Sequence, residues 1–181
     1  MTFSVGPIFI TDGMEIPVSL VRCVSEINLS LDMSCLMDAS VTITSARLKN
    51  VPKRVGLFTD KSPSAPSHCA SDGCAASPEM TEFLNCGESI TLRCFENRQG
   101  VLLPSNYDQR TKSFPANSPY GEICPYLELQ GLYEDVAAQR SGTFTYRFYL
   151  GEDCTSDFTL SRNGRYDVIV ELTYGGVDEL S

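Results

Sequence analysis

Residues 24–33 read Val-Ser-Glu-Ile-Asn-Leu-Ser-Leu-Asp-Met, and apolar and polar side chains alternate along them. A repeat of two residues is the period of a strand that buries one face. The same alternation returns in residues 40–48, which are rich in the β-branched side chains that strands favour. The buried face of the first strand is predicted to consist of Ile27, Leu29, Leu31 and Met33.

Alternation also marks the C-terminal part of the chain, in residues 142–150 and 165–174. Further strands are expected at residues 55–58, 88–95 and 124–133, whereas only residues 78–84 offer one or two helical turns. Many short strands without crossover helices indicate an all-β fold, namely an antiparallel Greek-key β-sandwich of about seven or eight strands. The inward faces expected in the last two strands are Phe144, Tyr146, Phe148 and Leu150, and Tyr166, Val168, Val170 and Leu172.

Three stretches are predicted to connect the strands. Residues 60–79 form a long loop rich in Ser, Pro and Cys, which is either a functional surface loop or a segment without fixed structure. Residues 96–122 are rich in Gly, Pro and Asn, and residues 151–157 form a turn. We expect the edge strands and residues 60–86 to provide the contact surfaces of the domain.

The chain contains eight cysteines, an even number that suits a disulfide framework in an oxidising compartment. Cys69 and Cys74 are close in sequence and are the first candidates for a disulfide. A zinc site built from His68, Cys69, Cys74 and Cys86 is an alternative, because structural zinc takes four such ligands. Free buried thiols are another. The remaining cysteines are Cys23, Cys35, Cys94, Cys124 and Cys154.

Composition narrows the class of protein further. The net charge is −9, from 14 basic and 23 acidic side chains, which argues against nucleic-acid partners and favours solubility. No run of apolar residues is long enough to span a membrane. Residues 1–7 lack the features of a signal peptide. Since the cysteine content looks secreted, we expect the chain to be a piece of a longer exported protein.

Catalytic residues are not apparent, and we expect neither an enzyme nor a bound cofactor or metal. The single histidine, His68, lies in the long loop, where nothing would hold it rigidly as a general base. Glu152, Asp153 and Asp157 could bind calcium, but their spacing is not that of an EF-hand. A carbohydrate-binding module is the main alternative, although the chain has no Trp for stacking on sugars. Its candidate rings are Tyr120, Tyr126, Tyr133 and Tyr149.

Several short motifs follow one another in the C-terminal half. Residues 144–151 read Phe-Thr-Tyr-Arg-Phe-Tyr-Leu-Gly, and residues 95–100 read Phe-Glu-Asn-Arg-Gln-Gly. Residues 126–131 read Tyr-Leu-Glu-Leu-Gln-Gly. In this order the motifs resemble those of Bacteroides-type fimbrillin-related proteins, and a weaker match lies at residues 21–29. The positions that carry the resemblance are Glu96, Asn97, Gly100, Leu150, Gly151, Asp157, Phe158, Arg162, Asn163 and Tyr166.

The resemblance implies a transthyretin-like sandwich in a fimbrial stalk, anchor or tip protein. Such proteins are exported as lipoproteins to the outer membrane and cell surface, and they join by inserting a strand of one subunit into the next. The partners would be other fimbrial subunits or domains of the same protein, with a host or bacterial surface ligand for a tip protein. Residues 1–174 would form one domain, and residues 175–181 would begin a linker to a following domain.

Overall fold

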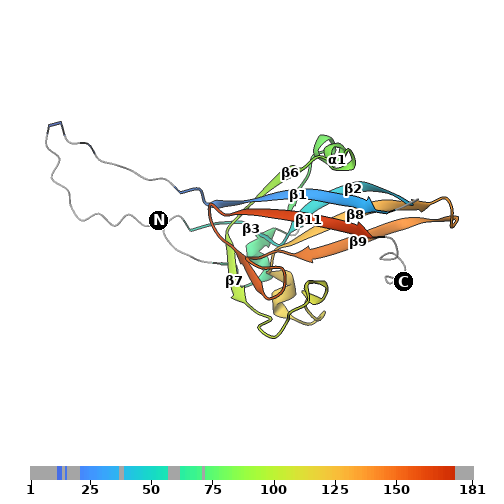
Figure 1. Cartoon of the computed structure of the whole chain (residues 1–181). Coiled ribbons are helices and arrows are strands. Elements are labelled where there is room, and N and C mark those ends of the chain that lie inside the picture. Colours follow the sequence, from blue (N-terminus) through green and yellow to red (C-terminus); the bar gives the residue numbers. More distant parts are fainter. Residues whose placement is uncertain are drawn as a thin grey trace.

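Two β-sheets lie face to face in the structure, a computed structural model that describes residues 12–13, 15, 21–36, 39–56, 62–70 and 72–173 (Figure 1). The front sheet has the strand order β11–β1–β6, and the back sheet has the order β5–β2–β8–β9. The front strands are β1 (Val24–Cys35), β6 (Ile90–Phe95) and β11 (Arg165–Thr173). The back strands are β2 (Ala39–Lys49), β5 (Cys74–Ala75), β8 (Tyr126–Asp135) and β9 (Arg140–Tyr149).

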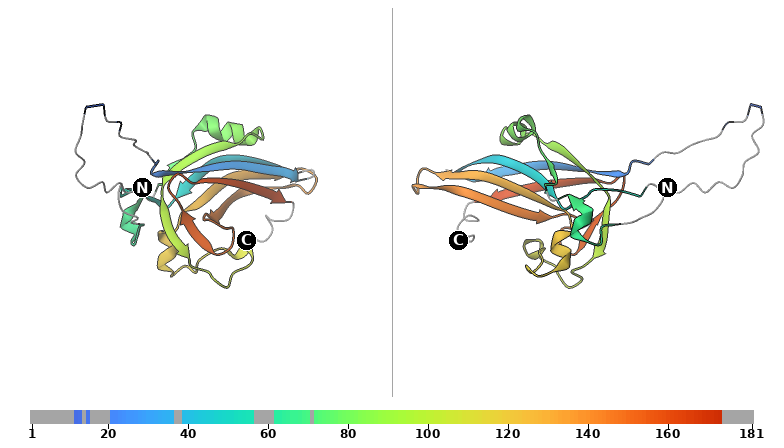
Figure 2. Two further views of the ribbon diagram at one scale, coloured as in Figure 1. Left: turned by 60° about the vertical axis from the view of Figure 1, so that its left-hand side comes forward. Right: turned by 180° about the vertical axis from the view of Figure 1, so that it is seen from behind.

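Smaller elements gather mainly at one end of the sandwich (Figures 1 and 2). Two short ribbons are formed by β7 (Asn97–Val101) with β10 (Asp157–Leu160), and by β3 (Val51–Pro52) with β4 (Cys69–Ala70). The helix α1 (Pro78–Asn85) lies over the upper long side. Three single 3₁₀ turns complete the described elements: η1 (Pro66–His68), η2 (Gln109–Thr111) and η3 (Pro119–Glu122).

The predicted all-β, sandwich-like fold is confirmed. One strand pair differs from the antiparallel expectation, because β1 and β11 run parallel, with Ile27 opposite Tyr166 and Leu31 opposite Val170. All other described pairs are antiparallel. The first and last strands of the sandwich are therefore neighbours, a long-range pairing that local sequence patterns do not encode.

The core lies between the two sheets and uses the predicted inward faces. Ile27 and Leu29 of β1 are fully buried, as are Leu127 and Leu129 of β8. Burying a leucine or isoleucine side chain contributes about 1.5–3 kcal/mol. Among the inward faces predicted near the C-terminus, Phe144, Leu150, Val170 and Leu172 are buried, whereas Tyr146, Phe148, Tyr166 and Val168 are half-buried.

Asn85 hydrogen-bonds the short helix to the back sheet, and Leu84 of the helix is buried in the main core. Ser77 caps its N-terminus by accepting from the backbone N–H of Met80, and Pro78 occupies the first turn, where a missing N–H costs nothing. At its other end Asn85 pairs with the backbone of Ile43, accepting from its N–H at 2.8 Å and donating to its carbonyl at 3.0 Å. Because the β2–β8 register shifts between Ile43 and Ser45, Asn85 satisfies the backbone beside that irregularity.

Several predicted boundaries change. Val55 and Gly56 lie outside any strand, and the rest of the expected strand at 55–58 falls outside the described residues. The predicted connection at 96–122 contains β7, and β10 begins at Asp157, which was assigned to a turn. The described residues of the 60–79 loop include η1, β4 and β5. The expected linker at 175–181 also lies outside the described residues.

Candidate functional site

The ten positions that resemble fimbrillin motifs converge where β6, β7, β10 and the start of β11 meet. At the centre is an ion pair between Arg162 and Glu96, whose side chains are 13% and 2% exposed. The Nε of Arg162 donates to Glu96 Oε2 at 2.9 Å, and its Nη2 donates to Glu96 Oε1 and to the carbonyl of Gly56. A buried pair of this kind holds its elements in one geometry, because separating the charges would leave one of them unpaired in the interior.

Asn97 extends this network into the loop region. It is fully buried, its Nδ2 donates to the carbonyl of Ile123 at 2.8 Å, and its Oδ1 accepts from Gln99 Nε2. Gly100 adopts a φ of 76°, which glycine reaches without strain, and its N–H donates to Thr159 Oγ1 on β10. These contacts tie β7 to both β10 and η3.

Gly151 and Phe158 form the apolar side of the same junction. A Cβ at Gly151 would lie 1.8 Å from the carbonyl oxygen of Asp157, so only glycine lets these two backbone segments approach. Phe158 is fully buried, and its ring centroid lies 4.6 Å from that of Phe114. Leu150 is buried beside them, and its N–H donates to the carbonyl of Pro125.

Asn163 and Tyr166 fasten the turn into β11. Asn163 sits in the left-handed region at a φ of 57°, and its N–H donates to the carbonyl of Val24 at the start of β1. The Tyr166 hydroxyl accepts from the N–H of Ser161 and donates to Glu152 Oε1, each at 2.8 Å. Burial raises the pKa of Tyr166, and the nearby Glu152 carboxylate raises it further. These side chains set where the parallel β1–β11 pairing begins.

In the acidic turn considered for calcium, the carboxylate of Asp153 binds backbone N–H groups of the same turn. Asp153 accepts from the backbone N–H groups of Thr155, Ser156 and Asp157. Burial pushes its pKa upward, but these hydrogen bonds outweigh burial and hold the pKa of Asp153 well below its usual range. Among the residues that the structure describes, no group of three or more His, Cys, Asp and Glu is arranged to hold a metal ion.

Lys112 also holds this junction together, although no sequence pattern pointed to it. It is 6% exposed, and its Nζ donates to the carbonyls of Asp153 at 2.6 Å and Asp157 at 2.7 Å. Its ammonium also lies over the ring of Phe158, 4.7 Å from the centroid. Burial lowers the pKa of Lys112, whereas the acidic turn raises it. A lysine in an irregular loop carries no pattern that would predict such burial.

The candidate catalytic and zinc-binding residues are not organised for chemistry. His68 is exposed, and its Nδ1 accepts from the backbone N–H of Ser64 at 3.4 Å. Cys69 is buried, and burial raises its pKa, which disfavours the reactive thiolate. The thiols of Cys69 and Cys74 belong to different apolar clusters, and all eight cysteines are free in the structure, so the Cys69–Cys74 disulfide stays a prediction.

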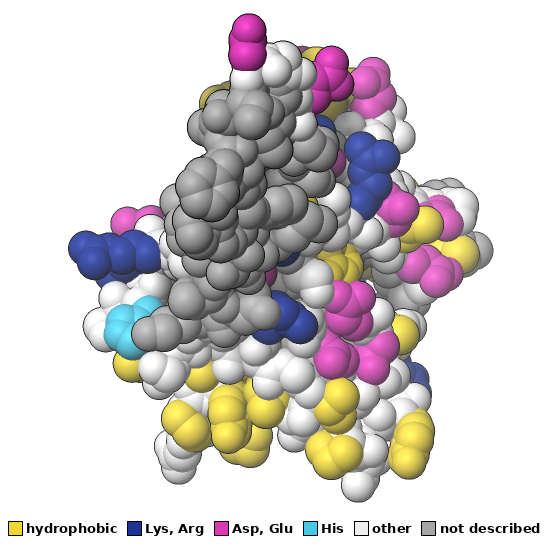
Figure 3. Space-filling model, turned by 90° about the vertical axis from the view of Figure 1, so that its left-hand side faces the viewer, with side chains coloured by type: hydrophobic (Ala, Val, Ile, Leu, Met, Phe, Trp, Pro, Cys, Tyr) yellow, Lys and Arg dark blue, Asp and Glu magenta, His cyan; other side chains and the backbone are white. Residues whose placement is uncertain are grey.

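The candidate sugar-binding tyrosines serve mainly in packing. Tyr149 contacts Phe114 edge-on at 5.1 Å between centroids, and its hydroxyl donates to the carbonyl of Gly121. Tyr126 packs 5.4 Å from Tyr149, whereas Tyr133 lies further along β8. Tyr120 is 42% exposed. Figure 3 shows one end of the molecule, where apolar side chains gather along the lower rim.

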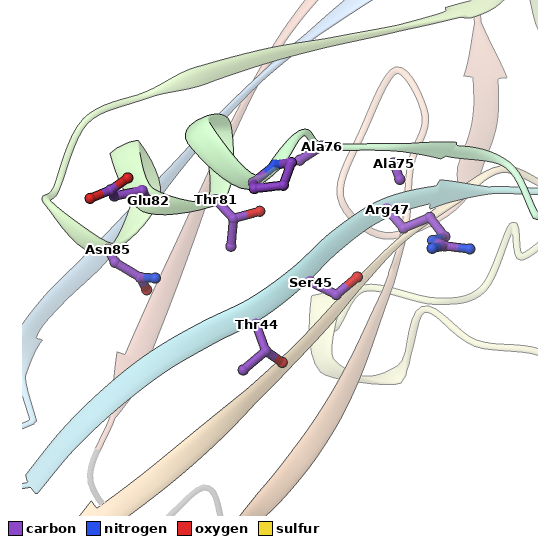
Figure 4. Close-up of a pocket in the computed structure, with 9 residues that line it drawn as sticks. Thr44, Ser45, Arg47, Ala75, Ala76, Thr81, Glu82 and Asn85 are labelled. Atoms are coloured by element: carbon purple, nitrogen blue, oxygen red, sulfur yellow. The ribbon is translucent and has the colours of Figure 1, made fainter.

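The larger of the two described hollows lies between α1 and β2 and has a volume of about 350 Å³ (Figure 4). It is lined mostly by small and polar side chains. Its charged residues, Arg47 and Glu82, lie at opposite ends, and Arg47 donates to the carbonyl of Asp72. The hollow therefore lacks converging acid, base or nucleophilic groups.

None of the described helices is long and apolar enough to cross a membrane.

The long side of the sandwich away from α1 carries two strand edges that pair with no described strand. Within the described residues, β9 is the last strand of the back sheet and β11 the last of the front sheet. Both lie at the bottom of their sheets in Figures 1 and 2. Four half-buried residues of these strands pack against the main core: Tyr146, Phe148, Tyr166 and Val168. The arrangement offers backbone hydrogen-bonding groups beside apolar side chains.

Comparison with known proteins gives one family match. A family model described as a domain of unknown function, DUF4906, matches residues 94–170. That range runs from β6 into β11 and contains all ten motif positions of the buried junction. No curated protein and no solved structure matches the chain. Residues 94–170 are thus similar to the DUF4906 domain.

Proposed function

We propose that the chain is a non-catalytic domain of a cell-surface fimbrial protein, in a stalk, anchor or tip subunit, and that it joins its neighbours by strand addition. The observation that carries this proposal is the pair of strand edges on one long side, β9 and β11. The fimbrillin-like motifs support it, because their side chains build a rigid junction rather than a reaction centre. The localisation is the outer membrane surface, with a lipid anchor in the full-length protein.

β9 and β11 offer an added strand both backbone hydrogen-bonding groups and apolar side-chain contacts. The outer edge of each strand presents N–H and C=O groups that no described strand satisfies, and such groups give an incoming strand its affinity. The half-buried side chains of Phe148 and Val168 offer apolar contact that fixes the register. Ile169, 71% exposed on β11, adds apolar surface on the outer face of the front sheet.

Long edge strands are sites at which another chain can pair. Natural sheets usually protect edge strands by covering them, shortening them or placing lysine or proline along them. β9 has ten residues and β11 has nine, and neither contains lysine or proline, although each carries other charged side chains, such as Arg147 and Asp167. Long edges that no described strand covers favour pairing with another chain.

Hydrogen exchange tests the proposal directly. Assemblies recovered from the surface of cells that make the full-length protein are compared with the isolated chain. We expect the amides of residues 140–149, 165–173 or both to gain protection on assembly, while those in central β1 and β8 stay unchanged. Assembly that protects neither edge would contradict strand addition, and a protein confined to the cell interior would contradict the surface role.

A matched pair of variants on β9 sharpens this test. Phe148→Ser removes a half-buried ring from the inward face, whereas Thr143→Ser alters an exposed residue on the same strand. We expect only Phe148→Ser to reduce assembly, with both variants folded by circular dichroism. Equal assembly of the two variants would show that this apolar face does not receive a neighbour.

A ligand-binding module is the second candidate. It is favoured by two exposed rings, those of Tyr107, 89% exposed, and Tyr120, 42% exposed. Binding on a glycan array that is lost in Tyr120→Ala and Tyr126→Ala would support this role, with Tyr107→Ala testing the most exposed ring. An array without signal for the folded wild-type chain would leave the assembly role as the better account.

A further inference from the structure

The fold places four of the eight cysteines in two sets of shared surroundings, Cys69 with Cys124 and Cys74 with Cys94. Cys69 and Cys124 share a small apolar cluster, which has only two other buried members, Ile123 and Phe158. Cys94 belongs to the main core, and Cys74 packs against that same core. The partners in each pair are far apart in sequence, so the grouping arises from the fold and not from chain proximity.

Cys69 and Cys124 both lie beside the backbone of residues 50–52. Cys69 lies opposite Pro52 in the β3–β4 ribbon. Asn50, two residues earlier, donates from Nδ2 to the carbonyl of Cys124 at 3.0 Å. Cys69 is 5% exposed and Cys124 is fully buried. Burial raises the pKa of Cys124 to about 12, the charge of Lys112 lowers it, and Cys69 raises it by a smaller amount.

The second pair bridges the two sheets. Cys74 lies on β5 opposite Leu48 of the back sheet, and Cys94 lies on β6 opposite Ser25 of the front sheet. β5 and β6 are in contact where the two sheets meet beneath α1. Cys94 points inward and is 6% exposed. Burial raises the pKa of Cys94 to about 12, with a further contribution from Cys74.

The other four cysteines have different surroundings. Cys35, Cys86 and Cys154 are exposed and Cys23 is half-buried. Cys35 lies near Glu171, and Cys86 forms the C-cap of α1. In the described contacts of these four residues, no second cysteine takes part.

We propose that the oxidised protein contains two disulfides, Cys69–Cys124 and Cys74–Cys94, and four free thiols. Each bond forms as two thiols lose two protons and two electrons. A disulfide of a thiol–disulfide oxidoreductase, or of oxidised glutathione, accepts them and is reduced to two thiols. These pairings replace the Cys69–Cys74 bridge expected from sequence proximity. The Cys74–Cys94 bond would link β5 of the back sheet to β6 of the front sheet. The Cys69–Cys124 bond would link β4 to the segment between η3 and β8.

Peptide mapping after oxidative refolding tests the pairings. The full chain is refolded in a glutathione redox buffer, so that thiols meet before burial, and the remaining thiols are alkylated. Trypsin cuts after Arg93, and further cleavage at Asp72 and after Glu82 places Cys69, Cys74 and Cys86 on separate peptides. We expect two cross-linked peptide pairs and alkylation of Cys23, Cys35, Cys86 and Cys154. A Cys69–Cys74 cross-link, or eight alkylated thiols, would overturn the proposal.

Single variants separate the two bonds. Cys124→Ser should free Cys69 for alkylation and leave Cys74–Cys94 intact, whereas Cys74→Ser should free Cys94 and leave the other bond. Cys154→Ser, at an exposed site, is the control and should preserve both bonds. Because the refolding is carried out in a defined buffer, the pairing can fail or succeed whatever the location of the protein in the cell. If Cys74→Ser left Cys94 cross-linked to another cysteine, the second pairing would be wrong.

Discussion

Arg162 and Glu96 are 66 residues apart in the chain, yet their side chains form a buried ion pair that joins the end of β6 to the turn before β11. The guanidinium meets both oxygens of the carboxylate, the geometry in which arginine binds carboxylates most strongly. Both residues lie inside the region that matches the DUF4906 model. The pair therefore joins two segments of the region that the family model matches.

Removing one partner of this pair should destabilise the fold severely. Glu96→Ala leaves the Arg162 guanidinium with little solvent and without its carboxylate, a change that costs about 3–5 kcal/mol. Urea unfolding followed by circular dichroism measures the effect. Arg110→Ala, which removes an exposed ion pair with Asp108, is the control and should leave the midpoint nearly unchanged. Equal losses in both variants would contradict the structural role of the buried pair.

Gly151→Ala should also be destabilising, by about 1–3 kcal/mol or more, because its methyl group would overlap the backbone of Asp157. Gly142→Ala makes the same chemical change on β9, where a Cβ meets nothing within 4 Å. Thermal unfolding of the two variants provides the comparison. A Gly151→Ala variant as stable as Gly142→Ala would show that the close approach of residues 151 and 157 is not required.

Acid should weaken the Asp153 turn. The folded-state pKa of Asp153 is depressed, so its contribution to stability is complete above the unfolded value of about 3.9 and is lost as the pH falls toward the folded value. We expect Asp153→Asn to melt below the wild-type chain at pH 7. The difference should shrink as the pH is lowered through about 4 toward 2. A difference that stayed constant over this range would show that the carboxylate charge does not matter.

Self-association should increase with salt. The chain carries a net charge of −9, so identical copies repel one another before any strand edges can meet. Salt shortens the range of this repulsion to about 10 Å at 0.1 M. Sedimentation at low and high ionic strength should show larger species in high salt, and Phe148→Ser should reduce the increase. Association that weakens with salt would instead indicate contacts between opposite charges.

The long strands could be predicted from the sequence because their inward and outward residues differ in polarity. β1 and β11 follow this rule, and the predicted inward residues of each are buried or half-buried against the core. β7 and β10 could not be predicted in the same way. β7 reads Asn-Arg-Gln-Gly-Val, and β10 has only four residues, too few for a repeat to be visible. The parallel pairing of β1 with β11 depends on residues about 139 apart, as between Asn28 and Asp167.

The motif positions were identifiable, but their physical roles were not. Sequence alone placed Gly151 in a turn, whereas the partner of Arg162 and the burial of Asn97 appear only in three dimensions. Lys112 carried no signal at all, since its partners are backbone carbonyls. Polar residues that bond to distant backbone leave no periodic trace in a sequence.

The parallel alignment of β1 and β11 has a mechanical consequence. Val24 begins β1 at one end of the sandwich, and Thr173 ends β11 at the other (Figure 1). A tensile force applied between these two residues runs along both strands and slides them past each other. Their hydrogen bonds are then loaded in shear, all at once, instead of being unzipped one after another. A domain threaded this way resists stretching along its long axis, the direction in which a filament under flow would be pulled.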